Sequence, residues 1–466
     1  MQAPHSLWWS TLDQPVTPRP SLREHLDVDV AIVGGGYTGL WSARELKRRD
    51  PSLRIAVLEK SVCGFGASGR NGGWASALYP LDDGAVLARY GPDALSHLRL
   101  ELQRAVRSLG EAIAGDRIDA HFAQGGTLNF ARNVVQAQRL REGVAAAHER
   151  GVTSEDLRWL DEREAADRGS LSGSLGATYS PHCARIHPAR LVRGLAEVNE
   201  RLGVKIFENT AVTRLVAGNA RRPPEALTLG GSVHARFILR ATEGFTTTLP
   251  GERRRVAPIY SLMIASDVQR RRFWDEVGFR HYETFADDRH LIIYGQRTND
   301  DRIAFGGRGA LYHFGSTVEE RFDQSAKVFD ALETTLRELF PSLEGPITHR
   351  WGGPIAMPRD HSPSVLVDYD SGLASAGGYT GDGVTLSYVA ANCVADLLCS
   401  PGTDTSFTRL PFVQHESRPW EFEPLRWMGI NTGLGLARWA DRVEERQHRS
   451  SRASDWLDRL YNDSRR

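Results

Sequence analysis

The most constraining feature of the sequence is a glycine-rich turn between two apolar runs near its start. The run 28–33 leads into Gly34-Gly35-Gly36-Tyr37-Thr38-Gly39, a helical pattern follows, and a second apolar run, 54–58, ends at Glu59. The acid therefore lies 20 residues after the last glycine of the turn. Strand, G-x-G-x-x-G turn, helix and terminal acid in this order predict a dinucleotide-binding βαβ unit.

Each part of this unit has its own physical task. Gly34 allows the tight turn, Gly36 lets the backbone approach a pyrophosphate, and Gly39 lets the helix pack close to the strand. The first N–H groups of the helix attract phosphate, and Glu59 is expected to hydrogen-bond ribose hydroxyls. The residues assigned to this site are Gly34, Gly36, Tyr37, Thr38, Gly39 and Glu59. The unit by itself leaves NAD and FAD both possible.

Composition excludes several other classes of protein. A chain of 466 residues is long enough for two lobes with a sizeable core. Its formal net charge of zero does not favour nucleic acid or an anionic membrane surface as a partner. The four cysteines form no C-x-x-C pair and no zinc-binding spacing, so we expect reduced thiols and no metal site. Residues 1–20 do not have the pattern of a signal peptide, and no apolar stretch is long enough to span a bilayer. We expect a cytoplasmic protein.

Two further glycine-rich loops decide between the two cofactors. The first, 63–74, reads CGFGASGRNGGW, and so many glycines imply unusual backbone angles or close approach to a flat ligand. Alone it could be a structural loop, but after a dinucleotide unit it is typical of the loop beneath the isoalloxazine ring of FAD. The second, 377–383, reads GGYTGDG and leads directly into an apolar helix over 384–398. No second fingerprint for NAD is present. The cofactor predicted is FAD.

The second loop contains a carboxylate, Asp382, at the point where the helix begins. The positive end of this helix would stabilise the charge that develops on a flavin as hydride arrives. A carboxylate near an anionic flavin is unfavourable unless it points away. We therefore expect Asp382 to be the N-cap of the helix, with its side chain turned to the backbone.

The hydrophobic patterns predict regular elements between these loops. The expected helices are 94–114, 132–150, 188–202, 318–339 and 384–398. The expected strands after the first unit are 204–208, 233–241, 256–266, 290–295 and 302–307. The alternation in the last three predicts an antiparallel sheet. Residues 1–26, with Trp8 and Trp9, look like an arm that packs on the body, and 441–466 looks like a surface helix with a loose tail.

The order of these motifs resembles one family over nearly the whole chain. GGGxxG, the acid, ASGRNGGW, RIHPARLVRGLA, RWGG and GGYTGDGVTLS are similar to the FAD-dependent D-amino-acid oxidase superfamily. The closer likeness is to its glycine oxidase, sarcosine oxidase and gamma-glutamylputrescine oxidase branch. The resemblance implies FAD, oxidation of a C–N bond next to an amine, and a two-lobed fold with the substrate between the lobes.

The resemblance also implies cofactor-binding positions and domain boundaries. Beyond the first unit, the matching positions are Lys60, Gly66, Ala67, Ser68, Arg70, Asn71, Gly72, Gly73, Val212, Gly353, Gly378, Gly381, Gly383 and Val384. The fold class expected is α/β, a Rossmann-like FAD-binding lobe interleaved with an antiparallel-sheet substrate lobe. The boundaries expected are 1–26 for the arm, 27–90, 180–245 and 346–415 for the FAD-binding lobe, 91–179 and 246–345 for the substrate lobe, and 416–466 for a C-terminal helix and tail.

Candidates for the substrate pocket come from the predicted substrate lobe. Those chosen are Tyr260, Arg297, Arg308 and Trp351, with Tyr294, Arg185 and His187 as further candidates. An arginine in this place could hold a carboxylate or a phosphonate through two hydrogen bonds. For each of these residues a structural or surface role is the simpler alternative: His187 before Pro188 suits a helix start, and Trp351 suits a core.

Two departures from the family pattern bear on the chemistry. The strand 302–307 has no lysine of the kind that promotes reaction with oxygen in monomeric sarcosine oxidases, so the electron acceptor stays open. Cys393 and Cys399 lie too far into their helix to bond the flavin, so FAD is expected to be non-covalent.

The function expected is oxidation of a small amine or amino acid, with hydride transfer to flavin N5, hydrolysis of the imine and reduction of O2 to H2O2. The substrate could be a polyamine derivative, an N-methylated or ordinary small amino acid, or an aminophosphonate. Alternatives are a dehydrogenase that uses a quinone or protein acceptor, and a flavin-binding subunit without turnover.

Overall fold

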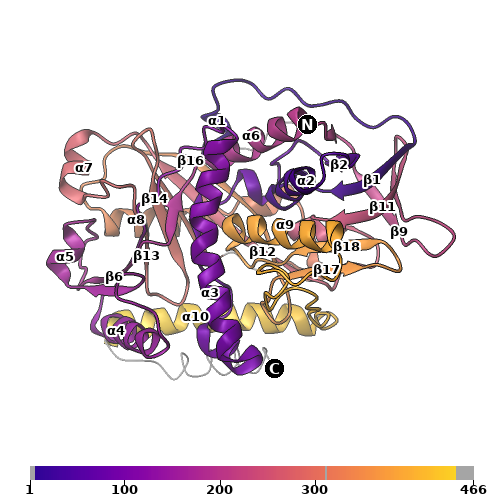
Figure 1. Ribbon diagram of the computed structural model, residues 1–466. Coiled ribbons are helices and arrows are strands. Elements are labelled where there is room, and N and C mark those ends of the chain that lie inside the picture. The colour runs from indigo at the N-terminus through magenta and orange to yellow at the C-terminus, as the bar shows by residue number, and fades with distance from the viewer. Residues whose placement is uncertain (1–5, 310–311, 448–466) are drawn as a thin grey trace.

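The chain folds around two large sheets. The computed structural model describes residues 6–309 and 312–447, with the side chains of Arg308 and Gln447 left out. Figure 1 shows one lobe at each side of the molecule, with the long helix α3 (Asp83–Gly115) running between them. The mixed α/β architecture predicted from the sequence is confirmed.

The first sheet is built on the dinucleotide unit. Its strand order is β17-β18-β11-β1-β2-β8, and all of these strands are parallel except β17. The strands of this sheet are β1 (Leu26–Val33), β2 (Ile55–Leu58), β8 (Lys205–Phe207), β9 (Val212–Val216), β10 (Glu225–Thr228), β11 (Ser232–Arg240), β17 (Ser364–Asp368) and β18 (Leu373–Gly377). Strand β1 lies between β11 and β2, and helices cover it on one face, so its continuous apolar run is buried.

Three helices pack on one face of this sheet and form the main core with it. These helices are α2 (Tyr37–Arg49), α6 (Pro188–Arg201) and α9 (Gly383–Cys399). Gly39 is essential to this contact, because a Cβ added there would lie 2.0 Å from the carbonyl oxygen of Gly34. The third glycine of the fingerprint therefore has the packing role predicted for it. The carboxyl ends of β1, β2 and β11 and the first residues of α2 and α9 meet at one edge of the sheet.

The second sheet is antiparallel except for one pair. Its order is β16-β12-β15-β14-β13-β4-β6-β5, and only β13 and β4 run parallel. The strands of this sheet are β4 (Thr127–Phe130), β5 (Arg158–Leu160), β6 (Ala177–Ser180), β12 (Ala257–Ser266), β13 (Thr284–Asp287), β14 (Ile293–Arg297), β15 (Ile303–Arg308) and β16 (Ile347–Met357). The predicted antiparallel sheet is confirmed. Strand β16, which the expected boundary at 346 puts with the first lobe, pairs with β12 in this sheet.

Short elements complete the two lobes. The small two-stranded sheet pairs β3 (Trp74–Ser76) with β7 (Cys183–Arg185). The remaining α-helices outside the first core are α1 (Leu7–Ser10), α4 (Val134–Glu149), α5 (Glu162–Ala166), α7 (Arg271–Val277), α8 (Ala326–Leu339) and α10 (Leu425–Gln447). The 3-10 turns are η1 (Ala67–Gly69), η2 (Glu243–Thr248), η3 (Phe314–Ser316) and η4 (Glu320–Asp323).

Two helices differ from their predicted bounds. Helix α3 begins 11 residues before the expected position, and its first turns are separated from the rest by a kink at Gly91, which has φ 84° and precedes Pro92. The helix predicted over 318–339 begins only at Ala326. The preceding residues form η4, which packs against β16 so closely that a Cβ on Gly352 would lie 2.9 Å from the carbonyl oxygen of Asp323. This tertiary contact overrides the helical pattern.

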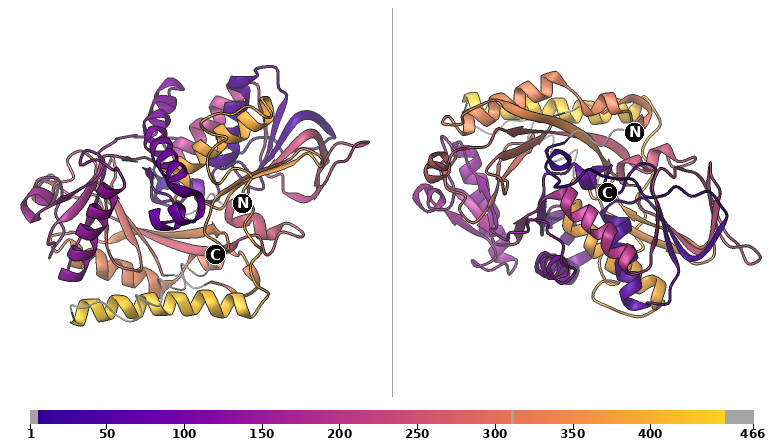
Figure 2. Two further views of the ribbon diagram at one scale, coloured as in Figure 1. Left: turned by 60° about the horizontal axis from the view of Figure 1, so that its bottom comes forward. Right: turned by 90° about the horizontal axis from the view of Figure 1, so that it is seen from above.

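Both ends of the described chain pack on the body. The prediction that the N-terminal arm docks through its tryptophans is confirmed, since Trp8 and Trp9 of α1 are buried. At the other end, helix α10 lies along the outside of the second sheet (Figure 2). Asp441 holds it there by accepting hydrogen bonds from the backbone N–H groups of His290 and Leu291 at 2.7 and 3.0 Å. The predicted tail beyond 447 is outside the described residues.

In the described part of the chain, none of the helices combines the length and the apolar character that crossing a membrane requires.

Replacement of Gly39 by alanine tests the close helix–strand contact. We expect Gly39→Ala to lower the free energy of unfolding by about 1–3 kcal/mol or more, because the added methyl group overlaps the Gly34 carbonyl. Gly143→Ala in α4 is the control: nothing lies within 4 Å of its added Cβ, and alanine favours the helix by ~1 kcal/mol. Urea unfolding measures both. Equal stabilities of the two variants would contradict the packing role of Gly39.

Candidate active site between the two lobes

A narrow cavity of about 280 Å³ follows the carboxyl edge of the first sheet. Its walls contain most of the positions predicted to bind the cofactor. These are Gly34, Gly36, Tyr37, Thr38, Glu59, Lys60, Gly66, Ala67, Ser68, Arg70, Asn71, Val212, Gly381, Gly383 and Val384. Sequence positions as far apart as 34 and 384 are therefore brought to one cavity.

At one end of this cavity the backbone is fixed tightly. Gly34 has φ 112°, and a Cβ there would lie 2.3 Å from the carbonyl oxygen of Ala241. The N–H of Tyr37, at the start of α2, donates to Ser68 Oγ at 2.8 Å. Glu59 follows the end of β2, and its carboxylate accepts the N–H groups of Gly35 and Ser61 at 2.8 and 2.9 Å. Burial raises the pKa of Glu59, and the two N–H groups oppose that shift.

The loop after β2 joins the cavity to the second sheet. Arg70 donates from Nη1 to Asp323 Oδ2 at 2.6 Å and to the carbonyl oxygen of Gly352 at 2.9 Å. Its guanidinium lies so close to β16 that a Cβ on Gly353 would be 3.4 Å from Arg70 Cζ. Gly353 itself lines the neighbouring larger cavity. Arg70 is therefore a link between the lobes.

The two glycines that follow are packed against β14. A Cβ on Gly72 would lie 2.5 Å from the ring of Tyr294. Gly73 has φ 72°, and a Cβ there would lie 2.0 Å from Gln296 Nε2. Gly72 lines the larger cavity, whereas Gly73 lines neither cavity and has a structural role in the loop.

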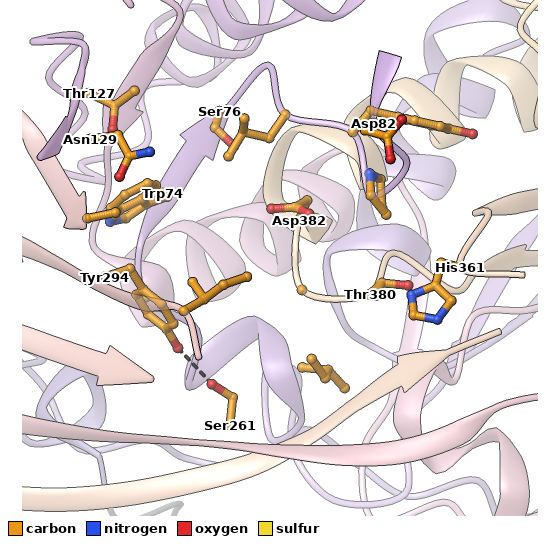
Figure 3. Close-up of a pocket in the computed structure, with 18 of the residues that line it drawn as sticks. Trp74, Ser76, Asp82, Thr127, Asn129, Ser261, Tyr294, His361, Thr380 and Asp382 are labelled. Carbon is orange, nitrogen blue, oxygen red and sulfur yellow. Dashed lines mark hydrogen bonds between the residues drawn. The ribbon is translucent and has the colours of Figure 1, made fainter. Parts of the chain in front are cut away.

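The late glycine loop closes the cofactor cavity from the other side. Gly378 and Gly381 have φ 79° and 110°, which lets the chain turn from β18 into α9. Asp382 is the N-cap residue of α9, as predicted, but its side chain makes no capping hydrogen bond to the helix, so that part of the prediction is wrong. Its φ −97° and ψ 35° are outside the extended region that a capping side chain requires. Asp382 lines the larger cavity instead, and Figure 3 shows its carboxylate inside that space.

Glu243 is a cavity residue that the sequence reasoning missed. It follows β11 with φ 42°, and its carboxylate accepts the N–H groups of Gly378 and Tyr379 at 2.9 and 3.3 Å. Burial raises the pKa of this carboxyl to about 7, although the two N–H groups oppose the shift. One sequence signal pointed to Glu243: it comes shortly after the carboxyl end of a parallel strand, and ligands of such sheets bind at that end.

A larger cavity of about 1540 Å³ lies between the lobes (Figure 3). Tyr294 and Ser261 of the second sheet stand on one side, with their hydroxyl groups 2.9 Å apart. Other polar and aromatic side chains in the lining are Trp74, Ser76, Asp82, Thr127, Asn129, His361, Thr380 and Asp382.

The two cavities share part of their walls. Six residues line both of them: Ala67, Arg70, Asn71, Ile355, Gly381 and Val384. They come from the loop after β2, from β16 and from the start of α9. We refer to this set as the junction. The junction belongs to both lobes. A ligand there would be in contact with the cofactor cavity on one side and with the larger cavity on the other.

Acidic side chains outnumber basic ones in the wall of the larger cavity. The aspartates are Asp82, Asp287, Asp288 and Asp382, and the arginines are Arg70, Arg89 and Arg289. Each of these arginines has a carboxylate partner. The pairs are Arg70–Asp323 at 2.6 Å, Arg89–Asp360 at 2.9 Å and Arg289–Asp287 at 2.6 Å.

Two of the predicted pocket residues lie in the protein core. Tyr260 is fully buried on the other face of β12, where its hydroxyl accepts the N–H of Glu319 at 3.3 Å. Trp351 is also buried, and its indole N–H donates to the carbonyl oxygen of Arg70 at 2.9 Å. Neither lines a cavity. Trp351, in β16, therefore contacts the loop 63–74, which we refer to as the cofactor loop.

Of the predicted arginines, Arg297 and Arg185 are not brought together with the junction. Arg297 pairs with Asp301 at 2.6 Å, stacks over Trp274 at 4.3 Å and lines a separate outer cleft. Arg185 lies over Tyr282 at 3.9 Å. The backbone of Arg308 pairs with Ser261, and its side chain is outside what the structure describes.

Of the two remaining candidates, one lies at the site and one does not. Tyr294 lines the larger cavity. His187 accepts the N–H of Arg190 at 3.2 Å and caps α6, which is the helix-start role that the sequence offers as an alternative.

The cavity fits FAD by its chemistry. The starts of α2 and α9 offer N–H groups to phosphate and to the flavin, and Glu59 offers a carboxylate to ribose. The Cβ positions at Gly34 and Gly36 are excluded by Ala241 and Ser68, so the backbone stays open to a ligand. When FAD is bound, the junction residues would lie against the flavin.

Known proteins are similar to this chain over most of its length. Gamma-glutamylputrescine oxidoreductase of Escherichia coli (strain K12) is 29% identical over 384 residues, which cover 82% of this chain and 86% of that protein. Sarcosine oxidase subunit beta of an Arthrobacter species is 23% identical over 397 residues, 80% of this chain and 89% of that protein. The crystal structure of glycine oxidase from Geobacillus kaustophilus has a TM-score of 0.70 at 22% identity, covering 84% of this chain and 99% of that one.

The sequence over residues 29–397 matches the family described as FAD dependent oxidoreductase (DAO). These residues include both glycine-rich cofactor loops, Glu59 and the whole junction. The chain belongs to the DAO family of FAD-dependent oxidoreductases.

Proposed function

We propose that this protein oxidises the C–N bond of a cationic amine that enters the larger cavity. The observation that carries the proposal is the junction: the cofactor cavity and a separate, larger cavity share the walls that would contact a flavin. The relatives support the reaction class, because their names give gamma-glutamylputrescine and sarcosine as substrates.

FAD, which the residues of the cofactor cavity would hold, would supply the redox chemistry: two-electron oxidation of the carbon next to nitrogen by hydride transfer to N5, with O2 as the final acceptor reduced to H2O2. The resulting imine is hydrolysed to an aldehyde or keto acid and ammonia or an amine. We propose that FAD is held without a covalent bond; the positions of Cys393, Cys399 and the other cysteines outside the lining of the cofactor cavity support this.

The protein contributes position and electrostatics. Helix α9 begins at the junction, and its positive end favours negative charge there. The ring of Tyr294 and the indole of Trp74, with ring centroids 6.1 Å apart in an edge-to-face arrangement, form an aromatic wall of the larger cavity. In the proposed function this wall would help to hold the substrate in one orientation.

The charge of the lining favours an amine over a carboxylate or phosphonate as the group to be recognised. An anion needs an arginine whose charge is not already balanced, and among the described side chains of the wall Arg70, Arg89 and Arg289 each have an acidic partner. Asp287 and Asp288 are themselves ion-paired, with Arg289 and Arg139 at 2.6 Å each. We therefore propose Asp382, next to Gly381 of the junction, as the carboxylate for an ammonium group on the part of the substrate away from the reacting nitrogen. The reacting nitrogen itself must lose its proton before hydride transfer.

The reaction class is tested by anaerobic mixing of the purified yellow protein with a panel of amines, amino acids and aminophosphonates. We expect a diamine or an amine with a second cationic group to bleach the flavin absorbance fastest. Admission of air should restore the colour within seconds and yield one H2O2 per turnover. A flavin that stays reduced in air would show a dehydrogenase, and a flavin that no substrate bleaches would show a binding subunit.

Replacement of Asp382 tests the charge preference. We expect Asp382→Asn to raise KM for a diamine by about 10–100-fold, because a charge-assisted hydrogen bond contributes about 1.5–3 kcal/mol. KM for a monoamine of similar length should change much less. Asp275→Asn is the matched control, since Asp275 lines the outer cleft beside Arg297. Steady-state kinetics with both substrates measure the effect, and equal changes for the two substrates would count against recognition of a second charge.

The carboxyl of Glu243 predicts a pH dependence of stability. Its pKa of about 7 in the folded protein exceeds its ordinary value of 4.5, so the folded protein binds more protons between these pH values. The contribution of Glu243 to the free energy of unfolding therefore falls as pH rises through this window. Glu243→Gln does not titrate. We expect the melting temperature of the variant apoprotein to rise relative to wild type from pH 4.5 to 7; a constant difference would contradict the assignment.

A further inference from the structure

Four consecutive carbonyl groups of the cofactor loop each accept a hydrogen bond from a side chain that lies behind the loop. The donors and acceptors are Ser6 Oγ to Gly69 O at 3.2 Å, Trp351 Nε1 to Arg70 O at 2.9 Å, Trp8 Nε1 to Asn71 O at 2.8 Å and Gln296 Nε2 to Gly72 O at 2.6 Å. Gln296 and Trp351 belong to the second sheet. The other two donors belong to the N-terminal arm.

The arm is not part of the family match, which begins at residue 29. Nevertheless Trp8 is 1% exposed and packs edge-to-face against Trp351, with 6.2 Å between ring centroids, and beside His187 at 5.2 Å. Its indole is thus held by the core on one side and by the cofactor loop on the other.

Asn71 lies in the junction, and its own side chain is used within the loop. Its Nδ2 donates to the carbonyl oxygens of Ala67 and Ser68, and its Oδ1 accepts the N–H of Gly73. Within the described chain, Trp8 is the donor found at the Asn71 carbonyl. A trans peptide is planar, so fixing this carbonyl also fixes the direction of the Gly72 N–H.

We propose that Trp8 is a positioning residue for the cofactor: its indole N–H orients the Asn71–Gly72 peptide at the junction and so sets the environment of the flavin. The proposal rests on the cofactor site described above, and it adds the N-terminal arm to that site. Trp8 acts through Asn71.

The neighbouring tryptophan provides a matched control. Trp9 is also buried, at 8% exposure, and contacts the same loop: a Cβ on Gly69 would lie 2.6 Å from Trp9 Nε1. Among the described residues its indole N–H has no hydrogen-bond partner. Phenylalanine at position 8 removes a donated hydrogen bond, whereas phenylalanine at position 9 removes only ring volume.

The experiment compares Trp8→Phe and Trp9→Phe by three measurements that need no substrate. FAD affinity is measured by titrating each apoprotein, the midpoint potential of the bound flavin by dye equilibration, and exchange of the loop amides 66–73 by mass spectrometry on the apoprotein. For Trp8→Phe we expect a tenfold or greater rise in the FAD Kd, a shifted potential, and loop exchange at least tenfold faster. For Trp9→Phe we expect changes within threefold and an unshifted potential.

Equal effects of the two substitutions on these measurements would overturn the proposal, because a merely structural role of the arm predicts similar losses from both rings. If Trp8→Phe does not fold, Ser6→Ala removes the other donor of the arm with little change in volume, together with the cap that Ser6 Oγ gives α1 by accepting the N–H of Trp9 at 3.4 Å. Faster exchange at 69–71 in that variant supports the positioning role, and unchanged exchange overturns it. A protein that binds FAD normally but bleaches with no amine would disprove the proposed function alone.

Discussion

The position of Arg70 is the constraint on which the active site depends. Its guanidinium donates to Asp323 and to the backbone of β16, and its own carbonyl accepts the indole N–H of Trp351. A loop that starts from the first sheet is thereby fixed to the second sheet. Because this loop lines both cavities, the place where they meet is set by the contact between the lobes. Four of the six junction residues, Ala67, Arg70, Asn71 and Ile355, belong to the two segments that this contact joins.

The charges around the junction are arranged asymmetrically. On the cofactor side, the starts of α2 and α9 supply positive potential, and on the substrate side the described wall contains four aspartates and three arginines. Asp382 lies at the boundary, beside the start of α9. A carboxylate there disfavours a negatively charged reduced flavin. In the proposed function a cationic substrate offsets this cost, which ties reduction of the flavin to occupation of the larger cavity.

Local patterns predicted the parts of the fold that depend on local geometry. The turn at Gly34, the packing at Gly39 and the acid at Glu59 are encoded within one short unit, and the structure has each in the expected place. The predicted start of helix α8 was wrong, because residues before Ala326 form a 3-10 turn that packs against β16. Glu243 was missed because its contact with Gly378 crosses a large distance in sequence.

The substrate side shows why strand residues could not be assigned from sequence. Successive side chains of a strand point to opposite faces. In β12, Ser261 lines the larger cavity, so Tyr260 points into the core of the second lobe. In β14, Tyr294 and Gln296 point to the cofactor loop, and Arg297 points away from it. The alternation was visible in the sequence, but which face meets the cofactor depends on how the two sheets are placed.

The most direct test of this account is an experimental structure of the protein with FAD bound. The account predicts adenosine density beside Glu59 and an isoalloxazine ring in contact with the junction, with one ring face open to the larger cavity. A ring placed outside the junction, or one closed off from the larger cavity by Tyr294 and Asp382, would contradict it.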